Sequence, residues 1–487
     1  MKLKISRKEN RFYPDFKRVI VRYLYYGDDR AKYLIDKVIN MLEEEAADAL
    51  TQTLRDFAMR HRNISKTFFK HYHRVKFLFR DLGLSAEEVS DTKKLLIGSY
   101  FSMEYSIESA AFFNPSIVQA PDQSGLVEGE KRVIVSFRAV GEGHISSIVF
   151  RNGIIHKDNT LTFNGAGNRI EEADIVKDHI YSKKTFIKKM KEMDIHLPTA
   201  DLVKQKLKEN FTYRDLKHAT YEVKEALQLN LENQTALNQI EWIADSHYEM
   251  QFSLDTDISE RVIFPISETE SQGIEDARFV RFIDEMGEVT YYATYTAFNG
   301  FTILPKLLET KDFYHFKVKP LYGEGAQNKN LALFPRKIDG KYAMISRIDG
   351  KNSYIMFSDS INVWENAIKL QEPLSHWEFI QVGNCGSPVE IKEGWLLITH
   401  GVGPMRKYCL GASLFDLDDP TKEIGRLREP LLEPNPEERE GYVPNVVYSC
   451  GALVHNDELI VPYAMSDYAS SFFSVPIEDL VNKILNR

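Results

Sequence analysis

The stretch Gly273-Ile-Glu-Asp-Ala-Arg-Phe279 places two carboxylates and a guanidinium within four residues, directly after a glycine that favours a turn. The run Val280-Arg-Phe-Ile283 then predicts a strand, Asp284-Glu-Met-Gly287 a turn, and Val289-Thr-Tyr-Tyr-Ala-Thr-Tyr-Thr296 a second strand. We therefore expect Asp276 and Arg278 where a loop enters a sheet, a place that a scaffold holds rigidly. A surface salt bridge at a strand start would use the same residue types. Features elsewhere in the chain are therefore needed to distinguish a functional site from a salt bridge.

Length and composition narrow the classes of protein. A chain of 487 residues is too long for one small core, and its 43% hydrophobic and 27% charged residues are typical of a globular protein. The net charge of −9 argues against a general nucleic-acid binder. The three cysteines, Cys385, Cys409 and Cys450, lie far apart and predict free thiols. With no secretory signal and no apolar window long enough to span a membrane, a cytoplasmic location is expected.

Residues 1–104 are predicted to form a helical extension. Apolar residues recur at helical spacing between Leu34 and Phe57, and Ser85-Ala-Glu-Glu88 has the pattern of a capping box that opens a further helix. His61, His71 and His73 raise the hypothesis of a metal site. Their sequence neighbours are lysines and arginines rather than carboxylates, so we do not expect metal binding.

From about residue 105 the chain repeats one pattern: a strand, a polar residue near its end, a turn and a second strand. The five segments with this pattern are 132–150, 290–304, 341–357, 394–415 and 458–475. The polar residues Tyr295, Arg347, His400 and Asp467 are 52, 53 and 67 residues apart, close to the repeat of a propeller blade. A sandwich would also supply hairpins, but not one conspicuous polar residue in each unit. We therefore predict a mainly β protein in which residues 105–487 form a five-bladed β-propeller.

One gap interrupts this period. Arg138 and Tyr295 are 157 residues apart, about a hundred more than one blade requires. The excess is predicted to be largely helical, in the segments 171–193, 199–210 and 213–244. It is best explained as a helical insertion, about residues 168–245, between the first and second blades. The helical extension and this insertion are candidates for contacts in a homo-oligomer.

If the blades converge, a group of charged residues would line one pocket: Arg138, Asp276, Arg278, Lys329, Arg347, His400 and Asp467. Lysine, arginine and histidine side chains from separate units suit an oxyanion such as phosphate. The alternative is that each residue pairs privately with a nearby carboxylate. The sequence has no glycine-rich phosphate loop, no His-Glu-x-x-His zinc motif and no serine nucleophile elbow.

Several short stretches occur together and in order: Phe113-Asn-Pro115, Gly273-Ile-Glu-Asp-Ala-Arg278, Asn328-Lys-Asn-Leu-Ala-Leu-Phe-Pro335, Gly340-Lys-Tyr342 with Arg347, Gly394-Trp-Leu-Leu-Ile-Thr-His-Gly-Val402, and Gly441-Tyr-Val-Pro-Asn-Val-Val447. With these motifs the chain resembles glycoside hydrolase family 130, whose members are five-bladed propellers acting on β-mannosides. The resemblance covers residues 105–487 apart from the insertion. The chain departs from the family pattern at Ala277, where proline is frequent, and in its long helical additions.

The resemblance implies roles for the residues of the predicted pocket. Asp276 would be the general acid, donating a proton toward the glycosidic oxygen through a sugar hydroxyl. The residues expected to bind the sugar substrate are Asn114, Arg138, Glu275, Arg278, Tyr295 and Asp467. Lys329, Arg347 and His400 match the positions that hold phosphate in the phosphorolytic members. No metal or organic cofactor is implied, because phosphate is a co-substrate.

The occupied basic positions favour phosphorolysis over hydrolysis. An inverting hydrolase needs a base to activate water, whereas bound phosphate is already an anionic nucleophile and needs positive charge to hold it in line. We predict an inverting β-mannoside phosphorylase that takes a short β-1,2 or β-1,4 mannoside and phosphate and makes mannose 1-phosphate, with no nucleic-acid or membrane partner. The alternatives are an inverting β-mannosidase with Glu390 or Glu440 as base, and a non-catalytic sugar-binding propeller.

Overall fold

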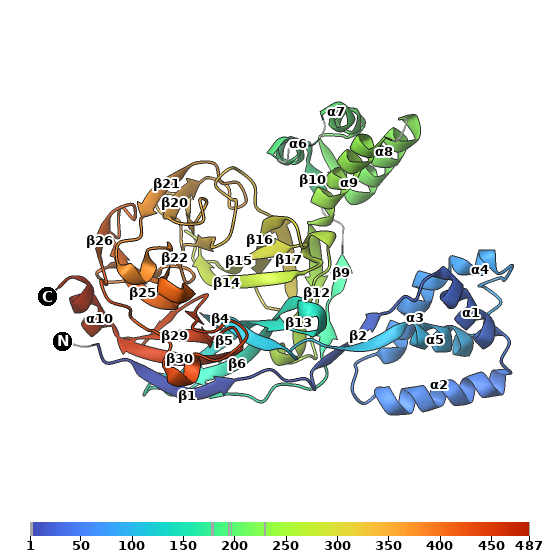
Figure 1. The fold of residues 1–487 in the computed structure, drawn as a ribbon, viewed down its shortest axis with the longest axis horizontal. Coiled ribbons are helices and arrows are strands. Elements are labelled where there is room, and N and C mark those ends of the chain that lie inside the picture. The colour runs from blue at the N-terminus through green and yellow to red at the C-terminus, as the bar shows by residue number, and fades with distance from the viewer. Residues whose placement is uncertain (1–2, 177–179, 193–194, 196, 228–229, 487) are drawn as a thin grey trace.

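A computed structural model describes residues 3–176, 180–192, 195, 197–227 and 230–486. It is mainly β, with two sets of helices apart from the sheets and one further helix, α10 (Ile477–Ile484), packed beside β25 and β30 near the C-terminus (Figure 1). In the described residues we distinguish five β-groups, each of antiparallel strands; the first two are joined into one 12-stranded sheet by a parallel contact between Ser146 of β6 and Gly273 of β14. The first consists of β4 (Ala111–Gln119), β5 (Lys131–Val140), β6 (Ser146–Ile155) and β7 (Leu161–Phe163). The second consists of β14 (Gly273–Ile283), β15 (Val289–Phe298), β16 (Ile303–Thr310) and β17 (His315–Pro320). The third consists of β18 (Ala332–Leu333), β19 (Tyr342–Ser346), β20 (Ser353–Ser358) and β21 (Ala367–Gln371).

The last two β-groups follow in the C-terminal part of the chain. They are β22 (Gln381–Asn384), β23 (Val389–Ile391), β24 (Gly394–Val402), β25 (Tyr408–Phe415) and β26 (Glu423–Arg426); and β27 (Val447–Tyr448), β28 (Leu453–His455), β29 (Glu458–Met465) and β30 (Ala469–Pro476). The five predicted hairpins are confirmed as the antiparallel pairs β5–β6, β15–β16, β19–β20, β24–β25 and β29–β30. Their apolar runs are long because these strands are buried on both faces, as in β24, where every residue is buried.

Hydrophobic cores lie between neighbouring β-groups. Between the first and second, Phe150 of β6 packs with Phe279 of β14. The other cores follow the same order: Leu307 with Met344, Ile345 with Trp395, Leu410 with Phe473, and Phe472 with Val133. The last of these joins the fifth β-group to the first, so the cores return to their starting point. In Figure 1 the C-terminal strands β29 and β30 accordingly lie next to β4 and β5.

The N-terminal strand β1 (Ser6–Phe12) extends the fifth β-group by pairing antiparallel with β30. Arg7 reinforces this contact, because its Nε and Nη2 donate to the two carboxylate oxygens of Glu438 at 3.0 and 3.1 Å. Residues 1–104 are predicted from the sequence to be helical, so this strand is not expected from the sequence. Its sequence is mostly charged and polar, which suits an edge strand exposed on one side but gives no strand pattern.

The remaining N-terminal residues form a separate helical unit, shown at the right of Figure 1. Its helices are α1 (Asp28–Ile39), α2 (Glu43–Phe57), α3 (Ile64–Val75), α4 (Leu78–Asp81) and α5 (Asp91–Tyr100), around a core of their own. The ribbon of β2 (Val19–Tyr23) and β3 (Ser102–Ser106) connects it to the sheets. The predicted capping box was wrong: α5 begins at Asp91, and the Ser90 hydroxyl accepts the backbone N–H of Lys93 at 3.3 Å.

The second set of helices comprises α6 (Lys183–Glu192), α7 (Leu197–Lys206), α8 (Tyr213–Ala226) and α9 (Leu231–Asp245). The helix predicted over 171–193 was wrong at its start, because β8 (Glu171–Glu172) and β9 (Asp174–Val176) precede α6; its residues 177–179 and 193 lie outside the described residues. Strand β8 pairs with β13 (Arg261–Ile263), and β9 pairs with β12 (Tyr248–Gln251). This pairing within the large sheet overrides the local helix propensity of the segment. The segment 213–244 is two helices rather than one.

Two further findings concern ligands and membranes. Within the described part of the chain, no helix is long and apolar enough to cross a membrane. In the same residues, no group of three or more histidine, cysteine, aspartate or glutamate side chains is arranged to hold a metal ion. Of the three histidines considered above, His61 contacts the Glu104 carboxylate at 2.7 Å and His71 contacts the Ser102 hydroxyl at 2.7 Å.

Candidate active site

A polar cavity of about 280 Å³ receives side chains from all five β-groups. Eight of the ten residues predicted from the sequence line it: Asn114, Arg138, Glu275, Asp276, Lys329, Arg347, His400 and Asp467. Further lining residues that the prediction missed include Asn330, Gln381, Arg406, Tyr408 and Tyr448. Because the β-groups converge here, residues more than 300 positions apart in sequence share one site.

Asp276 sits at a β-bulge inside β14 rather than in a loop before it. The pairing of β14 with β15 shifts between Glu275 and Arg278, and Asp276 has a φ of 53°. A similar shift in β4 gives Asn114 a φ of 48°, and the Asn114 amide donates to Asp276 Oδ1 at 2.6 Å. A bulge re-aims a side chain, and positive φ at a non-glycine residue is strained. Strain at two facing residues is typical of a functional site.

Cations surround the Glu275–Asp276 pair. Arg138 Nη2 donates to Glu275 Oε1 at 2.9 Å, and its Nη1 lies 3.5 Å from Asp276 Oδ1. The Lys329 ammonium donates to the other oxygen of Glu275. Burial works to raise the pKa of Asp276, but the nearby positive charges, together with the asparagine amide, outweigh it and hold that pKa below its ordinary value. At neutral pH the group is therefore a carboxylate.

Asp467 behaves in the opposite way although it lines the same cavity. Burial, followed by repulsion from Asp276, raises the pKa of Asp467 to about 6, and Arg138 and Arg406 offset only part of this. Two carboxylates of one cavity thus have pKa values displaced in opposite directions. Such a separation is how active sites assign different proton-transfer roles to chemically identical groups.

Arg347 and His400 form a pair without a carboxylate. Arg347 Nη1 donates to His400 Nε2 at 3.2 Å, and His400 Nδ1 donates to the backbone carbonyl of Asn384 at 3.1 Å. Burial, with Arg347 and Arg278 nearby, lowers the pKa of His400 well below its ordinary value, so the imidazole is neutral. Arg347 makes no ion pair within the described residues, and its buried Nε has no hydrogen-bond partner among them. The alternative in which each cation pairs with a nearby carboxylate therefore holds for Arg138 and Lys329 but not for Arg347.

Comparison with known proteins identifies the family. A family model described as beta-1,4-mannooligosaccharide phosphorylase matches residues 243–486, half of the chain. The chain belongs to glycoside hydrolase family 130. The resemblance seen in the sequence motifs is thereby confirmed. The match includes Asp276, Lys329, Arg347, His400 and Asp467, whereas the first β-group, with Asn114 and Arg138, precedes it.

Relatives of this family 130 chain include enzymes with named activities. It is 37% identical to a 1,2-beta-oligomannan phosphorylase of Thermoanaerobacter sp. (strain X514), over 44% of this chain and 72% of that protein. It is 29% identical to a beta-1,2-mannobiose phosphorylase of Listeria innocua, over 49% of this chain and 66% of that protein. The solved structure of a Listeria innocua beta-1,2-mannobiose phosphorylase with β-1,2-mannobiose aligns with a TM-score of 0.45 at 21% identity, covering 79% and 94% of the two chains.

Two residues expected to bind substrate do not line the cavity of this family 130 chain. Arg278 is 2% exposed and lies behind the bulge, where it donates to the Asp276 carbonyl at 3.0 Å and to the Tyr448 hydroxyl at 2.6 Å. The Tyr295 hydroxyl points away and donates to Glu270 Oε1 at 2.7 Å. The same carboxylate accepts from Lys306 at 2.7 Å. Arg278 thus contacts the backbone of the bulge itself, whereas the Tyr295 hydroxyl contacts Glu270, just before the strand that carries Asp276.

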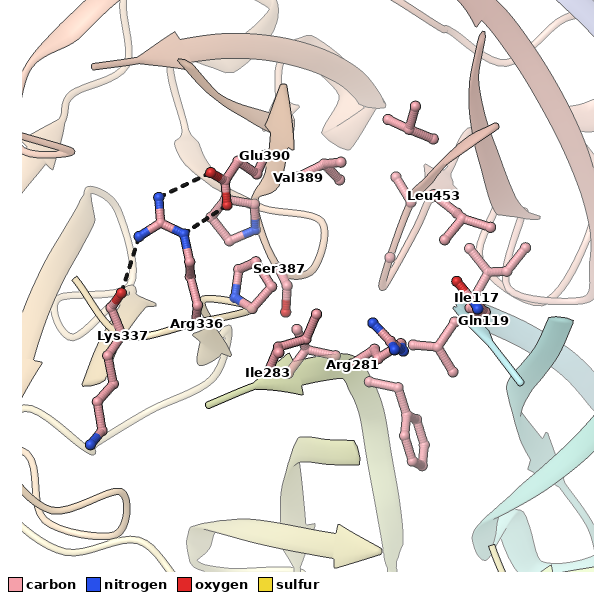
Figure 2. Close-up of a pocket in the computed structure, with 18 of the residues that line it drawn as sticks. Ile117, Gln119, Arg281, Ile283, Arg336, Lys337, Ser387, Val389, Glu390 and Leu453 are labelled. Atoms are coloured by element: carbon pink, nitrogen blue, oxygen red, sulfur yellow. Dashed lines mark hydrogen bonds and ion pairs between the residues drawn. The ribbon is translucent and has the colours of Figure 1, made fainter. Parts of the chain in front are cut away.

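The glutamates considered as hydrolytic bases lie elsewhere. Glu390 forms a two-point ion pair with Arg336, with Nε and Nη2 at 2.8 and 3.0 Å from its two oxygens, on the wall of a second cavity (Figure 2). Glu440 is exposed and does not line the cavity that holds Asp276. Of the carboxylates that do line it, Glu275 is held by Arg138 and Lys329.

Proposed function

We propose that this family 130 chain is an inverting β-mannoside phosphorylase. It takes a short β-1,2 or β-1,4 mannoside with inorganic phosphate and releases mannose 1-phosphate. The observation that carries the proposal is the buried guanidinium of Arg347, which shares a cavity with Asp276 and has no counter-ion among the described residues. A buried cation without a counter-ion is costly unless an anion binds it, and phosphate satisfies a guanidinium with two parallel hydrogen bonds.

The fold belongs to the same proposal. We take the five β-groups to be the blades of a five-bladed propeller, with residues 105–487 as the catalytic domain, residues 1–104 as an extension and about 168–245 as an insertion. The order of the hydrophobic cores supports this, because each β-group packs on the next and the fifth packs on the first. The cavity receives side chains from every group, as a propeller axis requires.

Phosphate would bind to Arg347 and Lys329. Arg347 presents a planar fork and Lys329 a mobile point charge that can exchange its Glu275 partner for the phosphate. His400 is neutral, so we assign it a positioning role: it holds Arg347 through Nε2 and is itself held by the Asn384 carbonyl. The sequence pointed to three basic residues here, but because His400 is neutral the positive charge comes from Lys329 and Arg347.

Asp276 would transfer the proton to the leaving group. As the C1–O bond to the leaving sugar breaks, an oxygen of monohydrogen phosphate bonds to C1 from the opposite face, and the leaving oxygen takes one proton. The overall reaction balances because monohydrogen phosphate supplies the proton that the released sugar carries. Arrival of that dianion beside Asp276 raises the pKa of its carboxyl, since a nearby like charge disfavours the ionised form. The acid thus becomes able to hold a proton when the nucleophile is in place.

The mannosyl unit would lie against Asn114, Arg138, Glu275 and Asp467, which offer donors and acceptors to sugar hydroxyls. Arg278 and Tyr295, expected from the sequence to bind substrate, are proposed instead to position the bulge at Asp276. The buried, unlinked cysteines are compatible with the cytoplasm, which we propose as the location. Self-association through the helical additions stays a prediction.

The test is product analysis with β-1,2- and β-1,4-mannobiose, each incubated with and without phosphate. Mannose 1-phosphate formed only when phosphate is present supports the proposal. Free mannose released at equal rates under both conditions would identify a mannosidase. Binding of either disaccharide without turnover would identify a sugar-binding protein.

A further inference from the structure

A second cavity, of about 490 Å³, lies at the other end of the segments that form the active site. Its walls come from β4, β14, the segment after β18, β23 with the residues before it, and β28 with the residues before it. Each wall continues a segment that lines the active-site cavity. Asn114 precedes Ile117 of the second cavity, Asp276 precedes Phe279, and Tyr448 precedes Gly451. A separation of three residues along a strand is about 10 Å.

Most of this second cavity is apolar. Its hydrophobic lining includes Ile117, Val118, Phe279, Val280, Pro388 and Leu453. The volume is within the range of about 300–1,000 Å³ that small-molecule sites occupy, and such sites combine apolar walls with a few well-placed polar groups. The polar groups therefore decide which class of ligand fits.

The charges around the second cavity are mostly matched. Arg336 is turned toward Glu390, as Figure 2 shows, and Lys337 pairs with Glu285 at 3.0 Å. Asp284 caps its own turn, accepting the backbone N–H groups of residues 286 and 288 at 2.9 and 2.8 Å. These groups are satisfied without a ligand.

Arg281 is the exception on this wall. Its half-buried guanidinium lies among the apolar side chains of the cavity (Figure 2), with the Tyr291 hydroxyl of the paired strand as a neutral neighbour, and it makes no ion pair within the described residues. Lys131 does not line the cavity, but its ammonium donates to the carbonyl of the lining residue Val454 at 3.1 Å, which places a second positive charge nearby. Burial, then the charge of Arg281, lowers the pKa of Lys131, so the two cations are close enough to repel. The buried Ser387 hydroxyl, also on the lining, has no hydrogen-bond partner in the described residues.

We propose that the second cavity binds a small amphipathic anion: a carboxylate with a short hydrocarbon chain, whose head group meets Arg281, with Lys131 nearby, and whose chain lies on the apolar walls. A guanidinium fork matches a carboxylate, and an anion there relieves the repulsion between the two cations. Inorganic phosphate would leave the apolar walls without contacts, so it fits the first cavity better than the second.

Isothermal titration of the full chain with octanoate, octan-1-ol and inorganic phosphate tests this. We expect octanoate to bind at least tenfold more tightly than octan-1-ol. Arg281→Gln should weaken octanoate binding at least tenfold and leave octan-1-ol within twofold. Ala452→Leu, which fills part of the cavity and keeps its charges, should weaken both. Arg347→Gln is the matched control: it removes the unpaired guanidinium of the first cavity and should leave octanoate binding unchanged.

Three results would overturn the proposal. Equal affinity for octanoate and octan-1-ol would show that the carboxylate charge does not contribute to binding. Unchanged octanoate binding in Arg281→Gln, with Ala452→Leu also unchanged, would place the ligand elsewhere. Binding of phosphate that Arg281→Gln abolishes would make the cavity a simple oxyanion site. None of these results depends on whether the chain is a phosphorylase.

Discussion

Replacing Asp467 by asparagine is expected to stabilise the protein at pH 8. The pKa of Asp467 is raised from 3.8 to about 6, so the folded state disfavours the ionised carboxyl. Each unit of pKa shift is about 1.36 kcal/mol, which sets an upper limit of about 3 kcal/mol for the cost of ionisation. Because the side chain keeps some exposure, we expect a gain of about 1–2 kcal/mol in the free energy of unfolding.

The stabilisation by Asp467→Asn is expected to depend on pH in a definite direction. A raised pKa means that the carboxyl does not disfavour folding below about pH 4, where it is protonated in both states, and that the cost develops as pH rises through about 6. Urea unfolding of the native protein and Asp467→Asn at pH 8 and pH 4.5 measures it. The gain should be largest at pH 8 and shrink at pH 4.5. Asp276→Asn is the matched control and should destabilise at pH 8, because the ordinary carboxylate there is held by cations. An equal gain at both pH values, or a loss at pH 8, would refute the reasoning.

Four further variants test the roles assigned to individual residues. Arg347→Gln should raise the KM for phosphate at least tenfold and change the KM for mannoside little; equal changes in both would argue against a phosphate contact. His400→Gln should raise the phosphate KM less than Arg347→Gln, because His400 acts through Arg347, and an equal or larger rise would contradict the positioning role. Asp276→Asn should abolish turnover while sugar binding, followed by calorimetry, persists. Lys306→Met should lower the free energy of unfolding by about 3–5 kcal/mol by leaving buried Glu270 without its cation, whereas the double variant with Glu270→Gln should recover part of the loss in urea unfolding.

Much of the strand structure was accessible from the sequence because it is local. The five hairpins follow from apolar runs separated by short turns, and both strands of each pair lie within about 25 residues of one another. Polar residues near the ends of those runs, such as Arg347 and His400, met in one cavity as expected. Family motifs supplied Asn114, which the spacing of the hairpins alone would not have singled out.

The rest depends on contacts between distant segments. Tyr295 has the spacing of a site residue, but its hydroxyl donates to Glu270, which also accepts from Lys306, and so points away from the cavity. His400 looks like a cation in the sequence, yet burial by neighbouring β-groups makes it neutral. Strand β1 pairs with β30 across nearly the whole chain, which no local pattern encodes. The opposite pKa displacements of Asp276 and Asp467 likewise arise only once their shared neighbours are assembled.

Arg347 and Lys329 are proposed to make phosphate, rather than water, the nucleophile in this cavity. Combined ¹H and ³¹P nuclear magnetic resonance during turnover of β-1,2-mannobiose, or of β-1,4-mannobiose if that is the substrate, measures this directly. We expect loss of inorganic phosphate matched by the appearance of α-mannose 1-phosphate as the first product, and no turnover without phosphate. Release of free mannose at an unchanged rate without phosphate, or a β-configured sugar phosphate, would contradict it.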